Sequence, residues 1–273
     1  MSTTALDYLP DPLRRAVVQA ITAEQMEGWR PSTEDVHDLA ALAGDEVTFG
    51  TYLAKHRAKY PVTVNQVRSS RRLFRRHRPY LLPGTELLRN NFGAESQEML
   101  TDLEFVATAG RLVQWHRRLA DHAVSIDDLD TRMLHQHVFA DVYPWAGNFR
   151  TTELQRGKTD FIWRSMVAAA TADIEHEARE IVDPRLSLDA DGLAYRLARV
   201  YANYNHVHPF REGNGRSGTL LLHTVVALRD RTLDLSRLTR EEWYEASRDS
   251  TPFRRDGRAN HRPFIPLLAR ALA

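Results

Sequence analysis

Apolar residues recur every three or four positions along most of the chain, which is the spacing of helices that bury one face. In the first such stretch, Leu13, Val17 and Ile21 fall on one face. Asp11-Pro12 opens this stretch with a capping residue and a proline suited to the first helical turn, and Gly28 closes it. The pattern therefore predicts an amphipathic helix at the start of the chain.

The same spacing predicts further helices almost to the end of the sequence. We expect them at residues 32–44, 52–60, 95–119, 125–139, 163–181, 188–203, 216–228, 239–247 and 261–272. One stretch departs from this period: residues 147–161 alternate around a turn that contains Gly157, as a β-hairpin does. The sequence thus predicts a mainly α protein, a helical bundle with one β-hairpin that must pack on the helices to be stable.

A run of arginines separates the first three helices from the rest of the chain. The run contains Arg68, Arg71, Arg72, Arg75, Arg76 and Arg78. Such a run indicates either a surface for an anion or nucleic acid, or a solvated linker whose charges pair elsewhere. We therefore divide the chain into a small helical domain at residues 1–60, a basic linker at 61–78 and a larger domain at 79–273.

Composition narrows the class of protein. The 273 residues carry 37 Lys and Arg against 36 Asp and Glu, so bulk attraction to nucleic acid or to an anionic membrane is not expected. Hydrophobic residues make up 42% and charged residues 27%, as in globular proteins. The chain has no Cys, which excludes disulfides, thiolate zinc sites and a Cys nucleophile. It has neither a secretory signal nor a long apolar run, and we expect a cytoplasmic protein.

The segment of residues 208–216, HPFREGNGR, concentrates side chains that carry chemistry. Pro209 and two glycines, Gly213 and Gly215, prevent a regular helix and allow backbone N–H groups to approach a ligand closely. The helix expected from Arg216 onward directs its first N–H groups and its dipole at this loop. The guanidinium of Arg216 adds a forked cation, so the segment predicts a phosphate site.

Two further residues of this segment suit a reaction at phosphate. Glu212 offers an oxygen ligand for Mg²⁺, and His208 titrates near neutral pH and can accept a proton. An anion site, a metal ligand and a base together are typical of phosphoryl or nucleotidyl transfer. A metal site of His135, His137, His206 and His208 is the weaker interpretation, because helical residues two apart point to different faces. We expect structural roles for the first three.

These residues resemble the signature of Fic-domain proteins, HPFx[D/E]GNGRxxR, up to its first Arg. Residues 80–88 and 139–147, together with Trp243 and Ala246, resemble other parts of the family, so the resemblance extends over about residues 79–273. It implies a mostly helical Fic fold that transfers a nucleoside monophosphate, commonly AMP from ATP. The acceptor would be a Tyr, Ser or Thr hydroxyl of a target protein.

The resemblance also implies a role for individual residues. His208 would deprotonate the target hydroxyl, Glu212 would hold Mg²⁺, and Arg216 would compensate the leaving pyrophosphate. The residues implied in nucleotide binding are Phe210, Gly213, Asn214, Gly215, Arg216 and Thr219. The hairpin would be the flap that pairs with the target's backbone, through Lys158, Thr159, Asp160, Phe161 and Ile162. Phe161 or Ile162 would hold the target, or would pack the hairpin on the core.

The sequence departs from the family at one position. Thr219 stands where the signature has its second Arg, whose counterpart in relatives contacts the γ-phosphate. The change indicates three alternatives to an efficient ATP-dependent enzyme. The protein could use another phosphate-containing donor, including as a kinase, could be slow, or could be a toxin–antitoxin regulator without activity.

The first helix resembles the inhibitory helix of the small antitoxins that partner Fic toxins, with its pattern [S/T]xxxE[G/N]. Glu27 and Gly28 match this pattern, whereas Ala23 occupies the Ser/Thr position. The resemblance implies that Glu27 reaches the nucleotide site of its own chain. Because the usual arginine partner is missing, Glu27 would need Arg216 or another partner. The alternative is an exposed residue in the last turn before a glycine.

Overall fold

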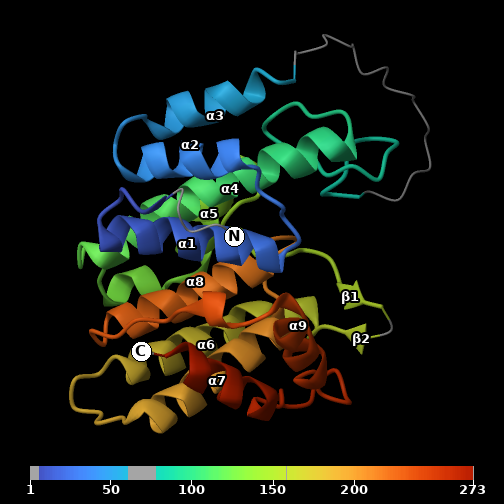
Figure 1. Ribbon diagram of the computed structural model, residues 1–273. Coiled ribbons are helices and arrows are strands. Elements are labelled where there is room, and N and C mark those ends of the chain that lie inside the picture. Colours follow the sequence, from blue (N-terminus) through green and yellow to red (C-terminus); the bar gives the residue numbers. More distant parts are fainter. Residues whose placement is uncertain (1–5, 61–77, 158, 273) are drawn as a thin grey trace.

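The computed structural model describes residues 6–60, 78–157 and 159–272. Most of the basic run, as well as Lys158, lies outside these residues. Figure 1 shows a mainly helical molecule with one small hairpin, which confirms the predicted fold class. The helices are α1 (Asp11–Met26), α2 (Thr33–Ala43), α3 (Phe49–Arg57), α4 (Gln97–Ala120), α5 (Thr131–Phe139), α6 (Val167–Ile181), α7 (Ala190–Val207), α8 (Asn214–Ala227), α9 (Arg240–Asp249) and α10 (Ile265–Ala271).

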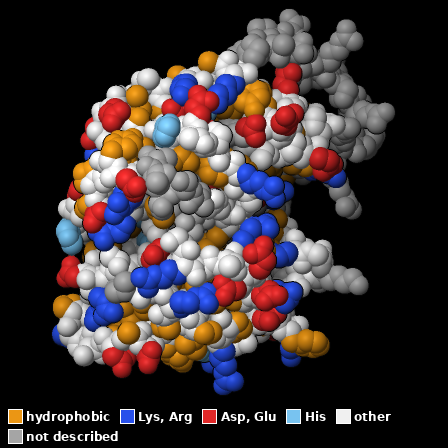
Figure 2. All heavy atoms as spheres, in the orientation of Figure 1, with side chains coloured by type: hydrophobic (Ala, Val, Ile, Leu, Met, Phe, Trp, Pro, Cys, Tyr) orange, Lys and Arg blue, Asp and Glu red, His pale blue; other side chains and the backbone are white. Residues whose placement is uncertain are grey.

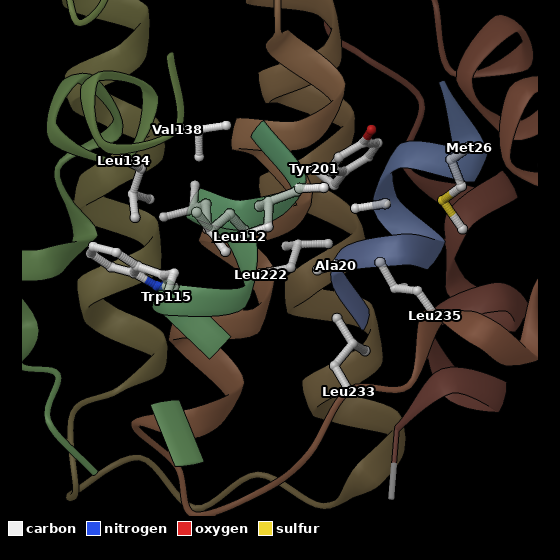
Figure 3. Packing of buried hydrophobic residues seen from close by; sticks show 14 of the residues in the cluster. Ala20, Met26, Leu112, Trp115, Leu134, Val138, Tyr201, Leu222, Leu233 and Leu235 are labelled. Carbon is white, nitrogen blue, oxygen red and sulfur yellow. The ribbon is translucent and has the colours of Figure 1, made fainter. Parts of the chain in front are cut away.

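The first helix is part of the main core. It packs along α4 and also contacts α2 and α8, while α7 packs on α6, α8 and α10 (Figure 1). Figure 3 shows Ala20 and Met26 of α1 in the same cluster as Leu112 of α4 and Leu222 of α8. Tyr201 of α7 lies in this cluster too. The apolar face that the sequence predicts for α1 is therefore buried against the larger part of the molecule.

Polar residues define where the helices begin and end. Ser32 and Asp35 form a reciprocal capping box at the start of α2. Helix α1 begins differently from the prediction, because Pro10 and not Asp11 is its N-cap. Asp11 lies inside the first turn, where its negative charge interacts favourably with the helix dipole. At the other end of α1, Arg240 Nε donates to the carbonyl oxygen of Met26 at 2.8 Å. This bond ties the end of α1 to α9.

Several predicted boundaries are wrong in an instructive way. The helix expected at residues 125–139 is a short 3-10 helix, Ile126–Leu129, followed by α5. The break falls at Asp130, whose carboxylate accepts hydrogen bonds from the N–H groups of Arg132 and Met133 and so starts a new helix. Helix α7 continues to Val207, and α8 begins at Asn214, two residues before the predicted start.

The hairpin is also shorter than predicted. Its strands are β1 (Gln155–Arg156) and β2 (Thr159–Asp160), antiparallel, with Gln155 opposite Asp160 and Arg156 opposite Thr159. Residues 147–154 instead have no strand structure, because Arg150 and the hydroxyl of Tyr80 bond to this backbone where cross-strand partners were expected. The backbone N–H of Thr151 donates to Tyr80 Oη at 2.7 Å.

The surface agrees with the near-zero net charge. Figure 2 shows Lys and Arg side chains interspersed with Asp and Glu over the face that it draws. Within the described residues, no helix combines the length and the apolar character that crossing a bilayer demands.

Burial of histidine makes the stability depend on pH. His223 is 7% exposed, and burial lowers its pKa to about 3, so it stays neutral in the folded protein. The unfolded chain takes up this proton below a pH of about 6.5, which favours unfolding. Between pH ~6.5 and pH ~5, the free energy of unfolding of His223→Phe should fall by about 2 kcal/mol less than that of the wild type. This is the difference that one titrating group produces.

Urea unfolding at each pH measures this difference. The matched control is His176→Phe, because the His176 side chain is 77% exposed and its loss should leave the pH slope of the wild type unchanged. Equal slopes for His223→Phe and the wild type would contradict the assignment of His223 as a neutral buried group.

Candidate functional site

The segment with the predicted chemistry is the loop between α7 and α8. His208 ends α7 in the left-handed region, with φ 47°, and its N–H donates to the carbonyl oxygen of Tyr204 at 2.9 Å. Gly213, with φ 78°, precedes α8. A Cβ at Gly213 would lie 2.2 Å from the ring of Phe139, so both its conformation and its surroundings require glycine.

Side chains from within and outside the loop fix its shape. Asn214 bonds to both backbone groups of Phe210, each at 2.9 Å. His135 of α5 bonds through Nε2 to the carbonyl oxygen of Glu212 at 3.0 Å and stacks on Phe210, with ring centroids 3.9 Å apart. Phe210, expected to bind nucleotide, is fully buried and does not line the cavity described below. Phe210 and His135 instead hold the loop.

Arg150 connects the loop to the base of the hairpin. Its side chain is buried, and its guanidinium donates to the carbonyl oxygens of His208 at 2.9 Å, Thr152 at 2.9 Å and Ile162. Three backbone segments therefore meet on one cation, and the left-handed His208 is held by its own carbonyl. Nothing in the local sequence distinguishes Arg150 from the many other arginines.

The loop lines a cavity of about 220 Å³. The predicted residues that face it are His208, Glu212, Gly213, Asn214, Gly215, Arg216, Thr219 and Glu27. The cavity is smaller than the ~300–1,000 Å³ of typical ligand pockets. Ala23, Met26 and Glu27 of α1 form part of its wall.

The imidazole of His208 is covered by the hairpin. Phe161 stacks flat on it, with ring centroids 3.8 Å apart and an angle of 9° between the planes. Burial, reinforced by the charge of Arg156, holds the pKa of His208 well below its usual value, so the imidazole is neutral at physiological pH. Its Nδ1 atom has no hydrogen-bond partner. A neutral imidazole with a free nitrogen can accept a proton.

The carboxylate of Glu212 faces the same cavity and bonds to Arg211. Burial raises the pKa of Glu212, and the charge of Arg211 opposes this shift. A single carboxylate beside a phosphate site matches the way Mg²⁺ is bound, by one or two carboxylates and the phosphates of the substrate. Glu212 therefore fits the predicted role of a magnesium ligand.

Arg216 lies in a buried cluster of carboxyl groups. Its Nη1 atom lies 3.2 Å from Glu24 Oε2 and 3.1 Å from Thr108 Oγ1, and its Nη2 atom bonds to Glu104 of α4. Glu24 is fully buried, and this burial raises its pKa to about 8 although Arg216 opposes the shift. The partner of Arg216 on α1 is thus Glu24, one turn before the residue that the motif predicted.

Glu27 reaches the start of α8 by another contact. Its Oε2 atom accepts a hydrogen bond from Tyr244 at 3.3 Å. A Cβ on Gly215 would lie 2.0 Å from its Oε1 atom, so the carboxylate lies against the first turn of α8, at the predicted phosphate site.

Thr219 donates its hydroxyl to the carbonyl oxygens of Gly215 and Arg216, at 3.1 and 3.0 Å.

The remaining predicted residues belong to the hairpin segment and to helices α5 and α7. In the hairpin, Thr159 and Asp160 are exposed, whereas Phe161 and Ile162 are buried. His137 and His206 bond to backbone carbonyl oxygens at 3.0 and 3.1 Å. Among the described residues, no three potential ligands gather into a metal site of His, Cys, Asp and Glu.

Comparison with known proteins identifies the family. Residues 125–226 match the Fic/DOC family. The chain is 31% identical over 175 residues to the probable protein adenylyltransferase y4lH of Sinorhizobium fredii, covering 62% of this chain and 85% of that protein. This protein belongs to the Fic/DOC family.

A further relative agrees with this membership, and solved structures share the fold. The protein adenylyltransferase VbhT of Bartonella schoenbuchensis is 27% identical over 173 residues, which are 63% of this chain and 35% of VbhT. The crystal structure of BepC from Bartonella tribocorum, with bound AMPPNP, superposes with a TM-score of 0.58 at 19% identity, covering 71% of this chain and 96% of that one.

A further solved structure extends the likeness over the N-terminal helices. A Fic-domain signaling protein of Bacteroides thetaiotaomicron has a TM-score of 0.58 at 13% identity and covers 98% of this chain and 90% of its own. At this identity the likeness concerns the fold alone.

The contact between Phe161 and His208 predicts a change in titration. Phe161→Ala should expose the imidazole and raise the pKa of His208 toward its ordinary value of about 6.5, because burial is the main cause of the shift. The pH dependence of the His208 ring signals in an NMR spectrum measures this pKa. Phe253→Ala is the matched control, since Phe253 is fully exposed. A His208 that stays neutral down to pH ~5 in Phe161→Ala would show that other groups bury it.

Proposed function

We propose that this protein transfers AMP from ATP to a hydroxyl side chain of a target protein, and that α1 of the same chain restrains it. One observation carries the proposal. The neutral imidazole of His208, the carboxylate of Glu212 and the first turn of α8 all face one cavity. Base, metal ligand and anion site are thereby together in a chain whose relatives are named protein adenylyltransferases.

The residues divide the reaction between them. The backbone N–H groups at the start of α8, at Gly213, Asn214 and Gly215, bind the phosphates, and Arg216 balances the charge that develops on the pyrophosphate. His208 takes the proton of a Tyr, Ser or Thr hydroxyl. The hydroxyl oxygen then bonds to the α-phosphorus as the bond to pyrophosphate breaks.

Glu212 holds Mg²⁺ in this proposal. The bound ion supplies neutralisation of phosphate charge. The hairpin offers its exposed residues, Thr159 and Asp160, to the backbone of the target. Phe161 and Ile162 are buried in the present state, so either can hold a target side chain only after the hairpin moves from His208.

Transfer of label tests the reaction. The protein is incubated with Mg²⁺ and ATP labelled at the α-phosphate, in a lysate that supplies targets. We expect protein-bound label that falls at least about a hundredfold in His208→Ala, because a positioned general base contributes about 10²–10⁴-fold. His176→Ala, which changes an exposed histidine, is the matched control.

Other outcomes favour the alternatives that Thr219 raises. Label that transfers only from the γ-phosphate would indicate a kinase. Transfer from a different nucleotide, but not from ATP, would indicate another donor, which suits the loss of the second Arg. Tight nucleotide binding without transfer by any variant would indicate a regulator, and would overturn the proposal.

The restraint by α1 follows from the contacts of Arg216. With Glu24 and Glu104 on its guanidinium, Arg216 is occupied by protein carboxyl groups and cannot reach a phosphate in the same geometry. Glu27 lies at the first turn of α8, where a phosphate would bind. Departure of α1 removes both Glu24 and Glu27 and leaves Glu104 as the carboxylate of the cluster. The site then gains space, and the removal of Glu27 from Gly215 makes its potential more positive.

Glu24 makes this restraint sensitive to pH. Its pKa of about 8 in the docked state falls to an ordinary value of about 4.5 when α1 leaves and Glu24 meets water. The docked state therefore binds more protons, and docking weakens as pH rises from ~4.5 through ~8. Arg216, Glu104, Thr108 and Glu27 are the polar and charged groups nearest this carboxyl.

Direct nucleotide binding tests the restraint without turnover. Glu24→Ala should bind ATP about tenfold more tightly than the wild type at pH ~7, since it removes the contact of α1 with Arg216. Glu24→Gln, similar in shape to the protonated acid, is the matched control and should bind like the wild type. Wild-type affinity should rise between pH ~7 and ~9, and that of Glu24→Gln should rise less.

Two results would contradict this account. Unchanged ATP affinity in Glu24→Ala, beside a gain in Glu27→Gly, would assign the restraint to Glu27 alone. Parallel pH profiles for the wild type and Glu24→Gln would exclude Glu24 as the titrating group. Isothermal calorimetry gives the affinities for each variant.

A further inference from the structure

The hairpin carries an arginine that lines the catalytic cavity. Arg156 is the last residue of β1, and it stands in the cavity wall together with His208 and Glu212. In the antiparallel register Arg156 lies opposite Thr159, so these two residues share one face of the hairpin, and the neighbouring Gln155 lies on the other face. The register thus agrees with the cavity wall, which includes Arg156 and not Gln155.

The guanidinium of Arg156 has no carboxylate partner in the part of the chain that the structure describes. Its Cζ atom lies 5.1 Å from the ring centroid of Phe161, and no hydrogen bond or ion pair joins the guanidinium to an Asp or Glu of this part. The residue is exposed, so its charge stays hydrated. A forked cation on the wall of a cavity, without a carboxylate to neutralise it, is available to an anion.

The rest of the cavity wall supplies little free positive charge. Arg216 is engaged by carboxyl groups of α1 and α4. Thr219, which stands where the signature has its second Arg, carries no charge and donates its hydroxyl within α8. Among the described residues that line the cavity, Arg156 is the one further Lys or Arg. A phosphate can therefore meet Arg156 without displacing a carboxyl group.

Arg156 lies close to the group that begins the proposed reaction. The ring of Phe161, which Arg156 contacts, stacks on the imidazole of His208 with centroids 3.8 Å apart. After burial, the charge of Arg156 is the largest cause of the low pKa of His208, ahead of Arg150 and Arg211. The phosphate nearest to His208 in this reaction is the α-phosphate, because the hydroxyl that His208 deprotonates attacks its phosphorus.

We propose that Arg156 binds the α-phosphate of the donor nucleotide. Its guanidinium can donate two parallel N–H bonds to two oxygens of this phosphate. The charge of these oxygens has to be balanced for the hydroxyl oxygen to approach the phosphorus. The contact also joins the nucleotide to the hairpin, so one side chain aligns the donor with the element that we propose for target docking. This inference rests on the proposed function, because it names a residue that holds the donor.

Titrations with ATP, AMP and adenosine, followed in the NMR spectrum of the full chain, test the contact. Arg156→Ala should weaken the binding of ATP and of AMP by about tenfold or more, because bonds to a charged group are lost, and should leave the binding of adenosine unchanged. Arg156→Lys should lose less affinity, since it keeps the charge but not the fork. The matched control is Arg164→Ala, which removes an exposed arginine that pairs with Glu153 and does not line the cavity. This variant should bind all three compounds like the wild type.

Several results would overturn the role of Arg156. Unchanged affinity for ATP and AMP in Arg156→Ala would exclude the contact. Weaker binding of ATP alone would place the arginine at the terminal phosphates, and equally weaker binding of adenosine would show a loss of cavity shape. ATP that binds neither the wild type nor Glu24→Ala would overturn the proposed function and, with it, this contact. A chain that binds AMP through Arg156 but transfers no label would contradict the proposed reaction and not the contact.

Discussion

A buried positive charge organises this molecule. Arg216 is buried, with 6% of its surface exposed, and an unpaired charge in that position would be far more costly than any single packing contact. It donates hydrogen bonds to Glu104 of α4, to Glu24 of α1 and to the hydroxyl of Thr108. The relative positions of α1, α4 and α8 follow from this requirement. The charge of Arg216, which suits a phosphate, thus also holds α1, the helix that we propose excludes phosphate from the site.

The chemistry of the loop and the shape of the loop come from different parts of the chain. His208, Glu212 and the start of α8 carry the reactive groups, but the carbonyl of His208 is held by Arg150 and that of Glu212 by His135. The left-handed conformation of His208 is therefore held by Arg150, and the loop has no regular secondary structure of its own. Buried, fully bonded polar groups specify one geometry at the cost of tolerance to substitution.

A feature of this structure could be predicted from the sequence when the residues that form it lie close together along the chain. Helical periodicity found the helices, and the local sequence from His208 to Arg216 found the loop, because both signals lie within a few residues. Glu24, Glu104 and Arg150 could not be found, since their roles depend on partners far along the chain. Glu24 and Glu27 lie three residues apart on one helix, so their sequence alone did not show which reaches Arg216. The predicted hairpin was too long, because an alternating pattern does not show that the buried Arg150 donates a hydrogen bond to the carbonyl oxygen of Thr152.

The cluster around Arg216 also bears on the order in which the chain folds. Its bonds join residues 192 and 112 positions apart in sequence. Contacts of such long range form only after much of the chain is already constrained, because closing large loops costs entropy. The restraint is therefore assembled in the step that docks α1 on α4 and α8. A newly made chain in which α1 has not yet docked lacks Glu24 at this guanidinium and is not yet restrained.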